Sequence, residues 1–228
     1  ENRIRTIQAS LAIEHNTLSL DQVTAVIDGK PVLGLPREIQ EVRNAFAAYE
    51  ALEQWHPQQV DDLLAAHALL LHGLIDDAGH WRSKGAGIYR GEQLVHMAPP
   101  ASRVPLLMAD LLHWLARSDW HPLLVSCVFH YEFEFIHPFA DGNGRTMRLM
   151  QHLLFLLGGQ RLARFVPSET AIMQNRDRYY VAIRQSRSLG SLHLILEFLA
   201  ECFALSAEAV GEEGRKLLRE SAGKTPEA

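Results

Sequence analysis

The 228-residue sequence predicts an all-α, mainly helical fold with one small β-hairpin. Apolar residues recur at spacings of three and four along most of the chain, which places them on one face of successive helices. A single segment, RSKGAGIYRGEQLVHMAPPA, breaks this spacing with glycines, β-prone residues and a double proline. Because 47% of the residues are hydrophobic, the chain is large and apolar enough to bury one sizeable core.

The helices are expected in the following order. Ile4, Ile7 and Leu11 define an apolar face in a first helix, and the residues from Ile39 to Tyr49 define one in a later helix. Between them, Ser19 and the glutamine three residues on form a capping box, which predicts a short helix over 20–28. Further helices are expected over residues 58–75, 103–117, 123–135, 145–157, 168–184 and 191–209.

The glycine-rich segment is the expected hairpin. Its strands contain Gly87, Ile88 and Tyr89 on one side and Val95, His96 and Met97 on the other; a turn over 90–92 joins them and the double proline at 99–100 stops the second strand. We divide the chain into an N-terminal region over 1–30, a main domain over 31–210 and a charged tail over 211–228.

Composition restricts the function classes. The net charge of −5 provides no overall basic surface for nucleic acid. Apolar runs are short and interrupted by histidines, and the first residues carry no signal-peptide pattern, so no membrane association is expected. The two cysteines, Cys127 and Cys202, lie in apolar helical segments and suit buried free thiols, which favours a reducing, cytoplasmic location.

The segment HPFADGNGRTMR, residues 137–148, raises an electrostatic question. Arg145 and Arg148 fall where a helix begins, beside unpaired N–H groups and the positive end of the helix dipole. Two cations three residues apart are unfavourable there unless an anion binds. The sequence therefore predicts an anion site at this helix start.

Neighbouring residues indicate which anion. Gly142, Asn143 and Gly144 can expose backbone N–H groups to a phosphate, and the two arginines can each grip phosphate oxygens, which suits a polyphosphate. Asp141 is a hard oxygen ligand of the kind that Mg²⁺ accepts together with phosphate oxygens. His137 can accept a proton from a hydroxyl group near neutral pH. Each feature alone is common in proteins, but their joint occurrence within twelve residues favours a functional site.

These residues resemble the signature His-x-Phe-x-Asp/Glu-Gly-Asn-Gly-Arg-x-x-Arg of the Fic family, without a gap. The family's enzymes typically transfer AMP from ATP to a hydroxyl side chain of a protein. The resemblance implies that His137 is the general base, that Phe139 fixes the loop and that Asp141 holds Mg²⁺. It also implies that Gly142, Asn143 and Gly144 cradle the nucleotide and that Arg145 and Arg148 bind the β- and γ-phosphates. ATP, and a hydroxyl-bearing target protein or the chain itself, are the partners it implies.

Two further segments are similar to parts of that family. The hairpin is similar to the family's flap, which pairs with an extended segment of the target beside the active site. NRDRYYVAI, residues 175–183, is similar to the helix that borders the adenine pocket and makes Asn175, Tyr179 and Tyr180 candidate contacts. Ordinary helix packing explains these three residues equally well.

The first helix resembles the family's inhibitory motif Ser/Thr-x-x-x-Glu followed by Gly or Asn. Ser10 and Glu14 match it, while His15 stands in the Gly or Asn position. The resemblance implies that Glu14 pairs with Arg148 and keeps ATP in an unreactive pose, because a carboxylate then occupies a guanidinium needed by phosphate. In some members the same glutamate also activates water to remove AMP.

Three other functions stay open. A Fic relative can transfer a phosphoryl group, although such relatives differ within the Gly-Asn-Gly-Arg portion. A metal hydrolase can be built from His130, His137, Asp141 and His152, but it leaves the arginines and glycines unexplained. A nucleotide-sensing module can keep the pocket without turnover, but it does not need His137. Self-association through the exposed residues of HWLARSDWHPL is also open.

Overall fold

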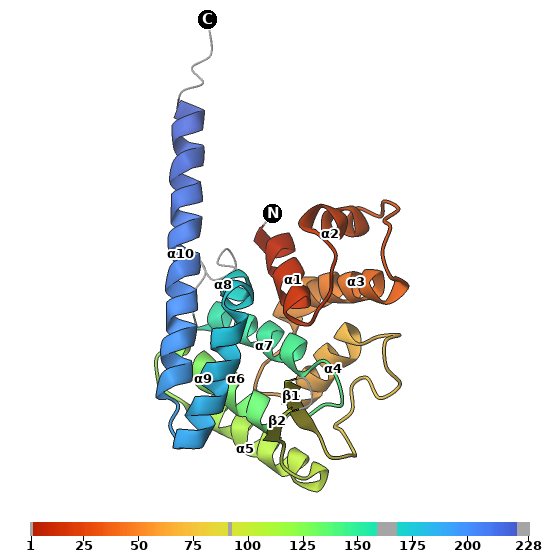
Figure 1. The fold of residues 1–228 in the computed structure, drawn as a ribbon, viewed down its shortest axis with the longest axis vertical. Coiled ribbons are helices and arrows are strands. Elements are labelled where there is room, and N and C mark those ends of the chain that lie inside the picture. Colours follow the sequence, from red (N-terminus) through yellow and green to blue (C-terminus); the bar gives the residue numbers. More distant parts are fainter. Residues whose placement is uncertain (1, 91–92, 159–167, 223–228) are drawn as a thin grey trace, which may run out of the picture.

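The computed structural model describes residues 2–90, 93–158 and 168–222. The mainly helical fold predicted from the sequence is confirmed (Figure 1). In chain order the elements are α1 (Asn2–Ile13), α2 (Leu20–Ile27), α3 (Pro36–Ala51), η1 (Leu52–Gln54), α4 (Val60–Leu70), β1 (Gly87–Arg90), β2 (Gln93–Met97), η2 (Ala101–Arg103), α5 (Val104–Arg117), α6 (Pro122–Ile136), α7 (Asn143–Leu157), α8 (Ser168–Gln174), α9 (Arg176–Leu189) and α10 (His193–Ala222).

The helices bury two apolar clusters. The larger cluster collects residues from α1 to α7, among them Phe129, Phe133 and Phe139. The smaller one is formed by α6, α8, α9 and α10 together with Ile13 of α1, and it includes Tyr179. α6 contributes to both clusters and packs against α7, and Phe139 places the loop that joins these two helices in the larger cluster.

Within the described residues, strands β1 and β2 form a two-stranded sheet, the expected hairpin. β1 and β2 pair antiparallel, with Gly87 opposite Met97 and Arg90 opposite Gln93, and the register shifts between Ile88 and Tyr89. Figure 1 places the hairpin next to the loop between α6 and α7. Residues 91 and 92 of the expected turn lie outside the described residues.

Several predicted helix ends were wrong for identifiable reasons. The helix expected over 58–75 ends at Leu70, because Gly73 adopts a positive φ of 69° and turns the chain. The helix expected over 168–184 is two helices, interrupted where Asn175 leaves the helical region with φ −115°. The last helix runs to Ala222 instead of residue 209, so residues 211–222 of the expected tail are helical.

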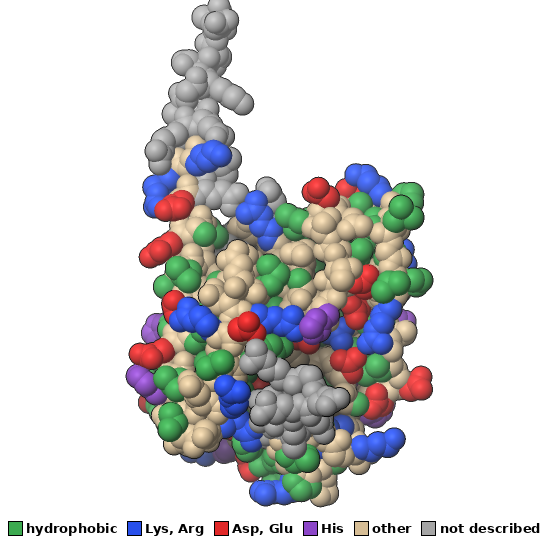
Figure 2. All heavy atoms as spheres, in the orientation of Figure 1, with side chains coloured by type: hydrophobic (Ala, Val, Ile, Leu, Met, Phe, Trp, Pro, Cys, Tyr) green, Lys and Arg blue, Asp and Glu red, His purple; other side chains and the backbone are tan. Residues whose placement is uncertain are grey.

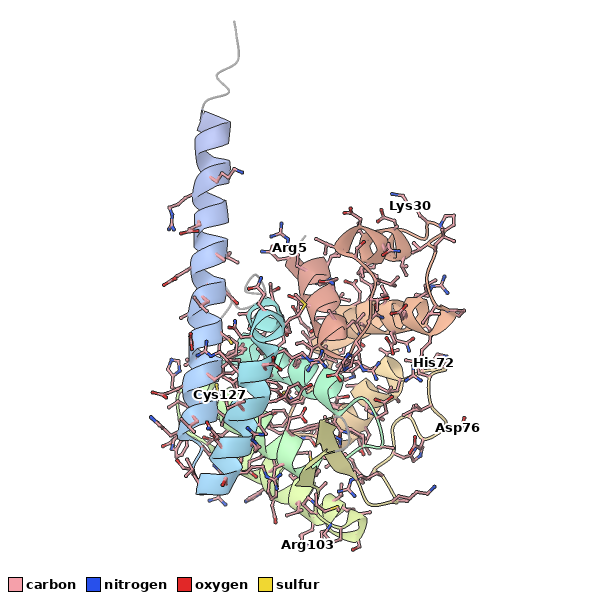
Figure 3. All side chains as sticks on the ribbon, in the orientation of Figure 1. Arg5, Lys30, His72, Asp76, Arg103 and Cys127 are labelled. Carbon is pink, nitrogen blue, oxygen red and sulfur yellow. The ribbon has the colours of Figure 1, made fainter. Side chains whose placement is uncertain are left out.

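The described surface carries charges of both signs, and both cysteines are buried. Figure 2 shows acidic and basic side chains interspersed over the described part of this face. Cys127, labelled in Figure 3, and Cys202 are both free and buried, and burial raises the pKa of their thiols to about 12 and about 11. No helix among the described residues is long and apolar enough to span a membrane.

Candidate active site

The loop between α6 and α7 carries the predicted site and is bounded by two left-handed residues. His137 caps the C-terminus of α6 with φ 50°, and Gly142 caps the N-terminus of α7 with φ 77°. A Cβ at Gly142 would lie 2.4 Å from Cδ2 of Leu71, so both the backbone and the packing require glycine there. The helix starts at Asn143, two residues earlier than expected, and its first turn presents the Gly-Asn-Gly backbone to the cleft.

Phe139 anchors this loop in the core. Its ring is completely buried and stacks on His67 of α4, with ring centroids 3.6 Å apart, and on Trp81. The side chain of Asn143 brackets the Phe139 backbone: Oδ1 accepts from its N–H and Nδ2 donates to its C=O, both at 2.8 Å. Asn143 therefore shapes the loop through its side chain, so only its backbone N–H is left to face a ligand.

His67 is a supporting residue that the sequence analysis missed. The backbone N–H of Gly79 donates to its Nδ1 at 2.8 Å, which leaves the proton on Nε2 to donate to the Asp141 carbonyl at 3.0 Å. Burial lowers the pKa of His67 and keeps the ring neutral. The histidine thus ties α4 to the loop immediately before Gly142. Its only sequence signal was a polar residue within an apolar helix.

His137 lines the cleft beside a buried carboxylate. Its Nδ1 is buried, without a hydrogen-bond partner among the described residues, and lies 3.7 Å from Oε2 of Glu134. Burial opposes ionisation of Glu134, but His137, His130 and Arg148 outweigh it and lower the pKa of this carboxyl group. Glu134 is therefore an anion beneath the imidazole, and Nε2 is the ring nitrogen left for a substrate.

Arg148 is bound by the two residues of the predicted inhibitory motif. Its Nε donates to the Ser10 hydroxyl at 3.0 Å, and one terminal nitrogen donates to the Ser10 carbonyl and to Oε1 of Glu14, both at 2.9 Å. Arg148 is 2% exposed, and its pKa is raised because Glu14 outweighs the cost of burial. A Cβ at Gly144 would lie 2.3 Å from Glu14 Oε1, so the carboxylate sits directly over the glycine backbone.

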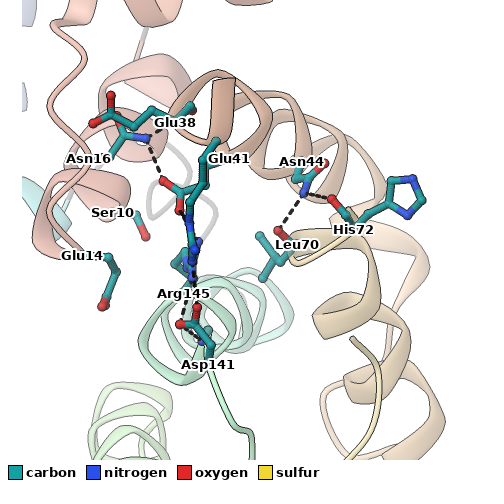
Figure 4. A network of polar contacts seen from close by, with 12 residues as sticks. Ser10, Glu14, Asn16, Glu38, Glu41, Asn44, Leu70, His72, Asp141 and Arg145 are labelled. Carbon is teal, nitrogen blue, oxygen red and sulfur yellow. Dashed lines mark hydrogen bonds and ion pairs between the residues drawn. The ribbon is translucent and has the colours of Figure 1, made fainter. Parts of the chain in front are cut away.

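Arg145 turns away from Arg148 toward α3. One terminal nitrogen donates to Glu41 at 3.2 Å and the other to Asp141 at 3.1 Å (Figure 4). Arg37 donates to the second oxygen of Asp141 at 3.1 Å. Glu41 also accepts from Asn16, just after α1. The structure thus gives the two arginines different partners: Arg148 lines the cleft with Glu14, whereas Arg145 is 5% exposed within an ionic network.

The cleft gathers most of the predicted residues. Its walls come from the end of α1, the loop, the start of α7 and α9, with the lining residues Ile13, Glu14, Glu134, His137, Ala140, Asp141, Gly142, Asn143, Gly144, Arg148, Tyr179, Tyr180 and Ile183. The hydroxyl of Tyr179 lies 2.7 Å from Nε2 of His130, so this hydroxyl group is hydrogen-bonded within the core. Asn175 is not among the lining residues; its side chain donates to the Ala171 carbonyl.

The hairpin residues are placed only in part. Gly87 and Met97 form the pair nearest the hairpin base, and Met97 is 62% exposed. The side chains of Ile88, Tyr89, Val95 and His96 lie outside the described residues.

The donor set fits a magnesium ion held largely by its nucleotide. Asp141 offers a carboxylate, 43% exposed, at the cleft, and Mg²⁺ commonly takes one or two protein carboxylates together with phosphate oxygens and water. Within the described ranges no three His, Cys, Asp or Glu side chains are grouped to hold a metal ion. Both ring nitrogens of His130 are engaged, by Gln151 and Tyr179, so the hydrolase site considered above is not formed.

Comparison with known proteins identifies a family domain within the chain. The model of the Fic/DOC family matches residues 57–155, which include the whole loop and α7 up to Phe155. The chain contains a Fic domain. This domain holds His137, Asp141 and both arginines, whereas α1, α3, α8 and α9 lie outside the matched residues.

Relatives extend the Fic similarity beyond the matched domain. The chain is 27% identical over 221 residues to the protein adenylyltransferase Fic of Nematostella vectensis, covering 89% of this chain and 47% of the relative. It is 28% identical to the protein of the same name from Aedes aegypti, covering 89% of this chain and 40% of the relative. The chain therefore spans less than half the length of these curated relatives.

Solved structures show the same Fic fold. A crystal structure of a Fic family protein from Desulfovibrio desulfuricans G20 superposes with a TM-score of 0.87 and 59% identity, covering 93% of this chain and 65% of that one. Residues 134–508 of Fic-1 from C. elegans superpose with a TM-score of 0.75 and 26% identity, covering 95% and 64% of the two chains.

Proposed function

We propose that this Fic-domain protein is a protein adenylyltransferase, which transfers AMP from ATP to a hydroxyl side chain of a target protein or of the chain itself. The observation that carries the proposal is the cleft, in which His137 and the Gly-Asn-Gly backbone share one wall with Arg148. The names of the curated relatives support the same activity.

Each group in the cleft has a chemical role in this reaction. Nε2 of His137 takes the proton from the target hydroxyl, whose oxygen forms a bond to the α-phosphorus while the bond from that phosphorus to the bridging oxygen breaks and pyrophosphate leaves. Glu134 stabilises the imidazolium that forms. Mg²⁺, held by Asp141 and the phosphates, would supply charge neutralisation.

The α7 N-terminus is suited to the phosphates. Backbone N–H groups from Gly142 to Gly144 and the helix dipole favour the negative charge, and Arg148 can bind the terminal phosphates. Arg145 takes the β-phosphate role only after exchanging Glu41 or Asp141 for phosphate, because both of its terminal nitrogens are engaged. Tyr180 borders the adenine side of the cleft.

Glu14 acts as an inhibitor in this proposal. It occupies the guanidinium of Arg148 and the space over Gly144, which the terminal phosphates need. ATP then enters in a pose that does not align its α-phosphorus with the hydroxyl. In this proposal the same carboxylate, which lines the cleft, also activates a water that removes AMP from a modified target.

The hairpin positions the target in this proposal. An extended segment adds to a strand edge through main-chain hydrogen bonds, which selects an extended shape more than a side-chain sequence. Exposed Met97 offers an apolar contact at the hairpin base. The hairpin edge therefore requires an extended, accessible segment of the target.

The proposal is tested by incubating the protein with Mg²⁺ and ATP labelled at the α- or the γ-phosphate and following the label retained on protein. We expect α-label on wild type at a low level and about ten- to a hundredfold faster labelling of Glu14→Gly, because a charge-assisted hydrogen bond is worth about 1.5 to 3 kcal/mol. His137→Ala in that background should label at least about a hundredfold more slowly.

Matched variants separate the outcomes. Glu14→Gln keeps the side-chain size without its charge, and His113→Ala removes an exposed histidine of α5 away from the cleft. Retained γ-label would indicate phosphoryl transfer instead. Bound ATP without label on any variant or added protein would favour a nucleotide-sensing module over the proposed enzyme.

A further inference from the structure

Arg82 is a buried arginine in the segment between α4 and the hairpin. It is 4% exposed, and burial lowers the pKa of its guanidinium. No carboxylate within the described residues pairs with it; its side-chain nitrogens donate to main-chain carbonyl oxygens. An unpaired buried cation is costly, so this set of partners needs a physical reason.

The first pair of carbonyls belongs to the end of α6. Nε of Arg82 donates to the His137 carbonyl at 2.7 Å, and one terminal nitrogen donates to the Ile136 carbonyl at 3.2 Å. The backbone N–H of Arg82 also donates to Pro138 at 2.9 Å. A helix C-terminus leaves carbonyls unpaired and carries partial negative charge, so the guanidinium finds there both acceptors and a favourable potential.

The second pair of carbonyls belongs to the two ends of the hairpin. One terminal nitrogen of Arg82 donates to Lys84, ahead of β1, at 2.8 Å, and the other donates to Pro99, after β2, at 2.6 Å. Between them the hairpin base closes with a hydrogen bond from Ala98 N–H to the Ala86 carbonyl. One side chain therefore connects both legs of the hairpin to the backbone of His137.

This connection matters because His137 has a left-handed backbone. With φ 50°, a residue that has a Cβ is strained, and it keeps this conformation only where its surroundings hold it. The guanidinium holds the carbonyl on one side of His137, while the hydrogen bond from its N–H to Phe133 holds the other. Loss of Arg82 removes the donor of four buried or part-buried carbonyls.

We propose that Arg82 is a positioning residue for transfer: it fixes the distance between the hairpin that holds the target and the imidazole that deprotonates it. The proposal rests on the function proposed above, because it assigns the hairpin to the target and His137 to the proton. It adds a coupling between these two elements, carried by four hydrogen bonds from one guanidinium.

The transfer test uses the uninhibited Glu14→Gly protein as parent, with Arg82→Gln and Arg82→Lys added. We expect labelling from α-labelled ATP to fall at least about tenfold in Arg82→Gln, with Arg82→Lys intermediate, because one ammonium reaches fewer carbonyls. The Kd for ATP measured by calorimetry should change less than about twofold, since Arg82 does not touch the cleft wall around Gly144 and Arg148. Arg103→Gln, exposed at the end of η2 (Figure 3), is the charge-matched control.

Hydrogen exchange followed by mass spectrometry tests the coupling without relying on activity. In Arg82→Gln, peptides from the hairpin ends and from the 133–139 segment should both exchange at least about tenfold faster, while α10 peptides over 193–205 stay as in the parent. Faster exchange in only one of the two segments, or an equal increase throughout the chain, overturns the coupling.

The labelling and hydrogen-exchange experiments together distinguish a failure of the positioning role from a failure of the proposed adenylyl transfer. Unchanged labelling in Arg82→Gln, or labelling and ATP affinity that fall by the same factor, overturns the positioning role. Coupled exchange in a parent that binds ATP but transfers no label overturns the proposed adenylyl transfer, and with it the claim that the coupling serves transfer.

Discussion

At the residue scale, the backbone of His15 explains why the proposed inhibitory motif ends as it does. His15 has φ 71°, its N–H donates to the Ala12 carbonyl and the N–H of Asn16 donates to the Leu11 carbonyl. These two bonds form a Schellman motif that ends α1, with His15 at the left-handed position. Gly or Asn is favoured there on conformational grounds, and histidine is among the residues that tolerate it. The turn fixes Glu14 at the C-cap position, immediately after the last residue of α1.

This geometry predicts a stability difference between two substitutions of His15. Both His15→Gly and His15→Ala remove the imidazole and its contact with Arg176, but only alanine keeps the Cβ that strains a left-handed residue. His15→Gly should be more stable than His15→Ala by about 1 kcal/mol, or about 2 to 4 °C in Tm for a chain of this size. Calorimetric melting measures both; equal Tm values would contradict the strain.

Residue-scale chemistry was predictable where it is local in sequence. The loop from His137 to Arg148 joins adjacent helices, so its spacing already brought together the base, the glycines and the helix start. Arg82, His67 and Glu41 reach the loop from distant segments, and neither periodicity nor spacing reports such contacts. The same reason explains why Arg145 was expected beside Arg148: the sequence did not show that Glu41 lies opposite it.

At the element scale, His130 joins three helices. From α6, its Nδ1 lies 2.9 Å from Oε1 of Gln151 on α7 and its Nε2 lies 2.7 Å from the hydroxyl of Tyr179 on α9. Because an amide oxygen only accepts, Nδ1 carries the proton and Nε2 accepts from the tyrosine. Burial lowers the pKa of His130 to about 4, so the ring is neutral in the folded protein at neutral pH.

This network predicts how stability depends on pH. The folded pKa of His130 lies below its unfolded value of about 6.5, so the folded state resists protonation and stability falls as pH drops from about 6.5 to about 4. The effect of Glu169 in α8 on stability has the opposite sign, because burial raises the pKa of its carboxyl group to about 7. Its contribution to stability is complete below about pH 4.5 and is lost as the pH rises through 7. The two effects oppose each other near pH 5.

Urea unfolding at pH 7 and pH 5 separates them. Between pH 7 and pH 5, the free energy of unfolding of His130→Gln should rise by about 2 kcal/mol relative to that of wild type. The reason is that a glutamine can serve both hydrogen-bond partners without titrating. Glu169→Gln should lose a similar amount over the same interval. If the free energies of unfolding of both variants changed with pH in the same way as that of wild type, the two buried groups would not titrate as the structure requires.

Element boundaries were predictable where capping residues mark them. Ser19 and Gln22 form the expected capping box, and α2 begins at Leu20. The break at Asn175 was missed because it carries neither Gly nor Pro, and its bend depends on how α8 and α9 pack against α10. Tertiary packing, which a local pattern does not encode, decided that boundary.

At the scale of the whole molecule, helix α1, which leads into the proposed inhibitory residue Glu14, belongs to the core. Ile7 and Leu11 of α1 are buried in the larger apolar cluster, and Ile13 is buried in the smaller one. After α1 the chain is fixed to α3, since Asn16 donates to the Glu38 carbonyl and the N–H of Thr17 donates to the Glu38 carboxylate. Glu14 is the exception, with a side chain that is 37% exposed. Relief of the proposed inhibition therefore requires movement of the Glu14 side chain, with the helix in place.

Removing α1 and removing its carboxylate should consequently differ in outcome. Deletion of residues 1–15 takes three buried aliphatic side chains out of both clusters, each worth about 2 to 5 kcal/mol, which approaches the whole stability of a typical domain. We expect the deleted chain to lose its cooperative melting transition by circular dichroism, whereas Glu14→Gly should melt cooperatively within a few degrees of wild type. A deleted chain that melts like wild type and labels like Glu14→Gly would show instead that α1 is a separable inhibitor, and that inhibition is relieved when the helix leaves.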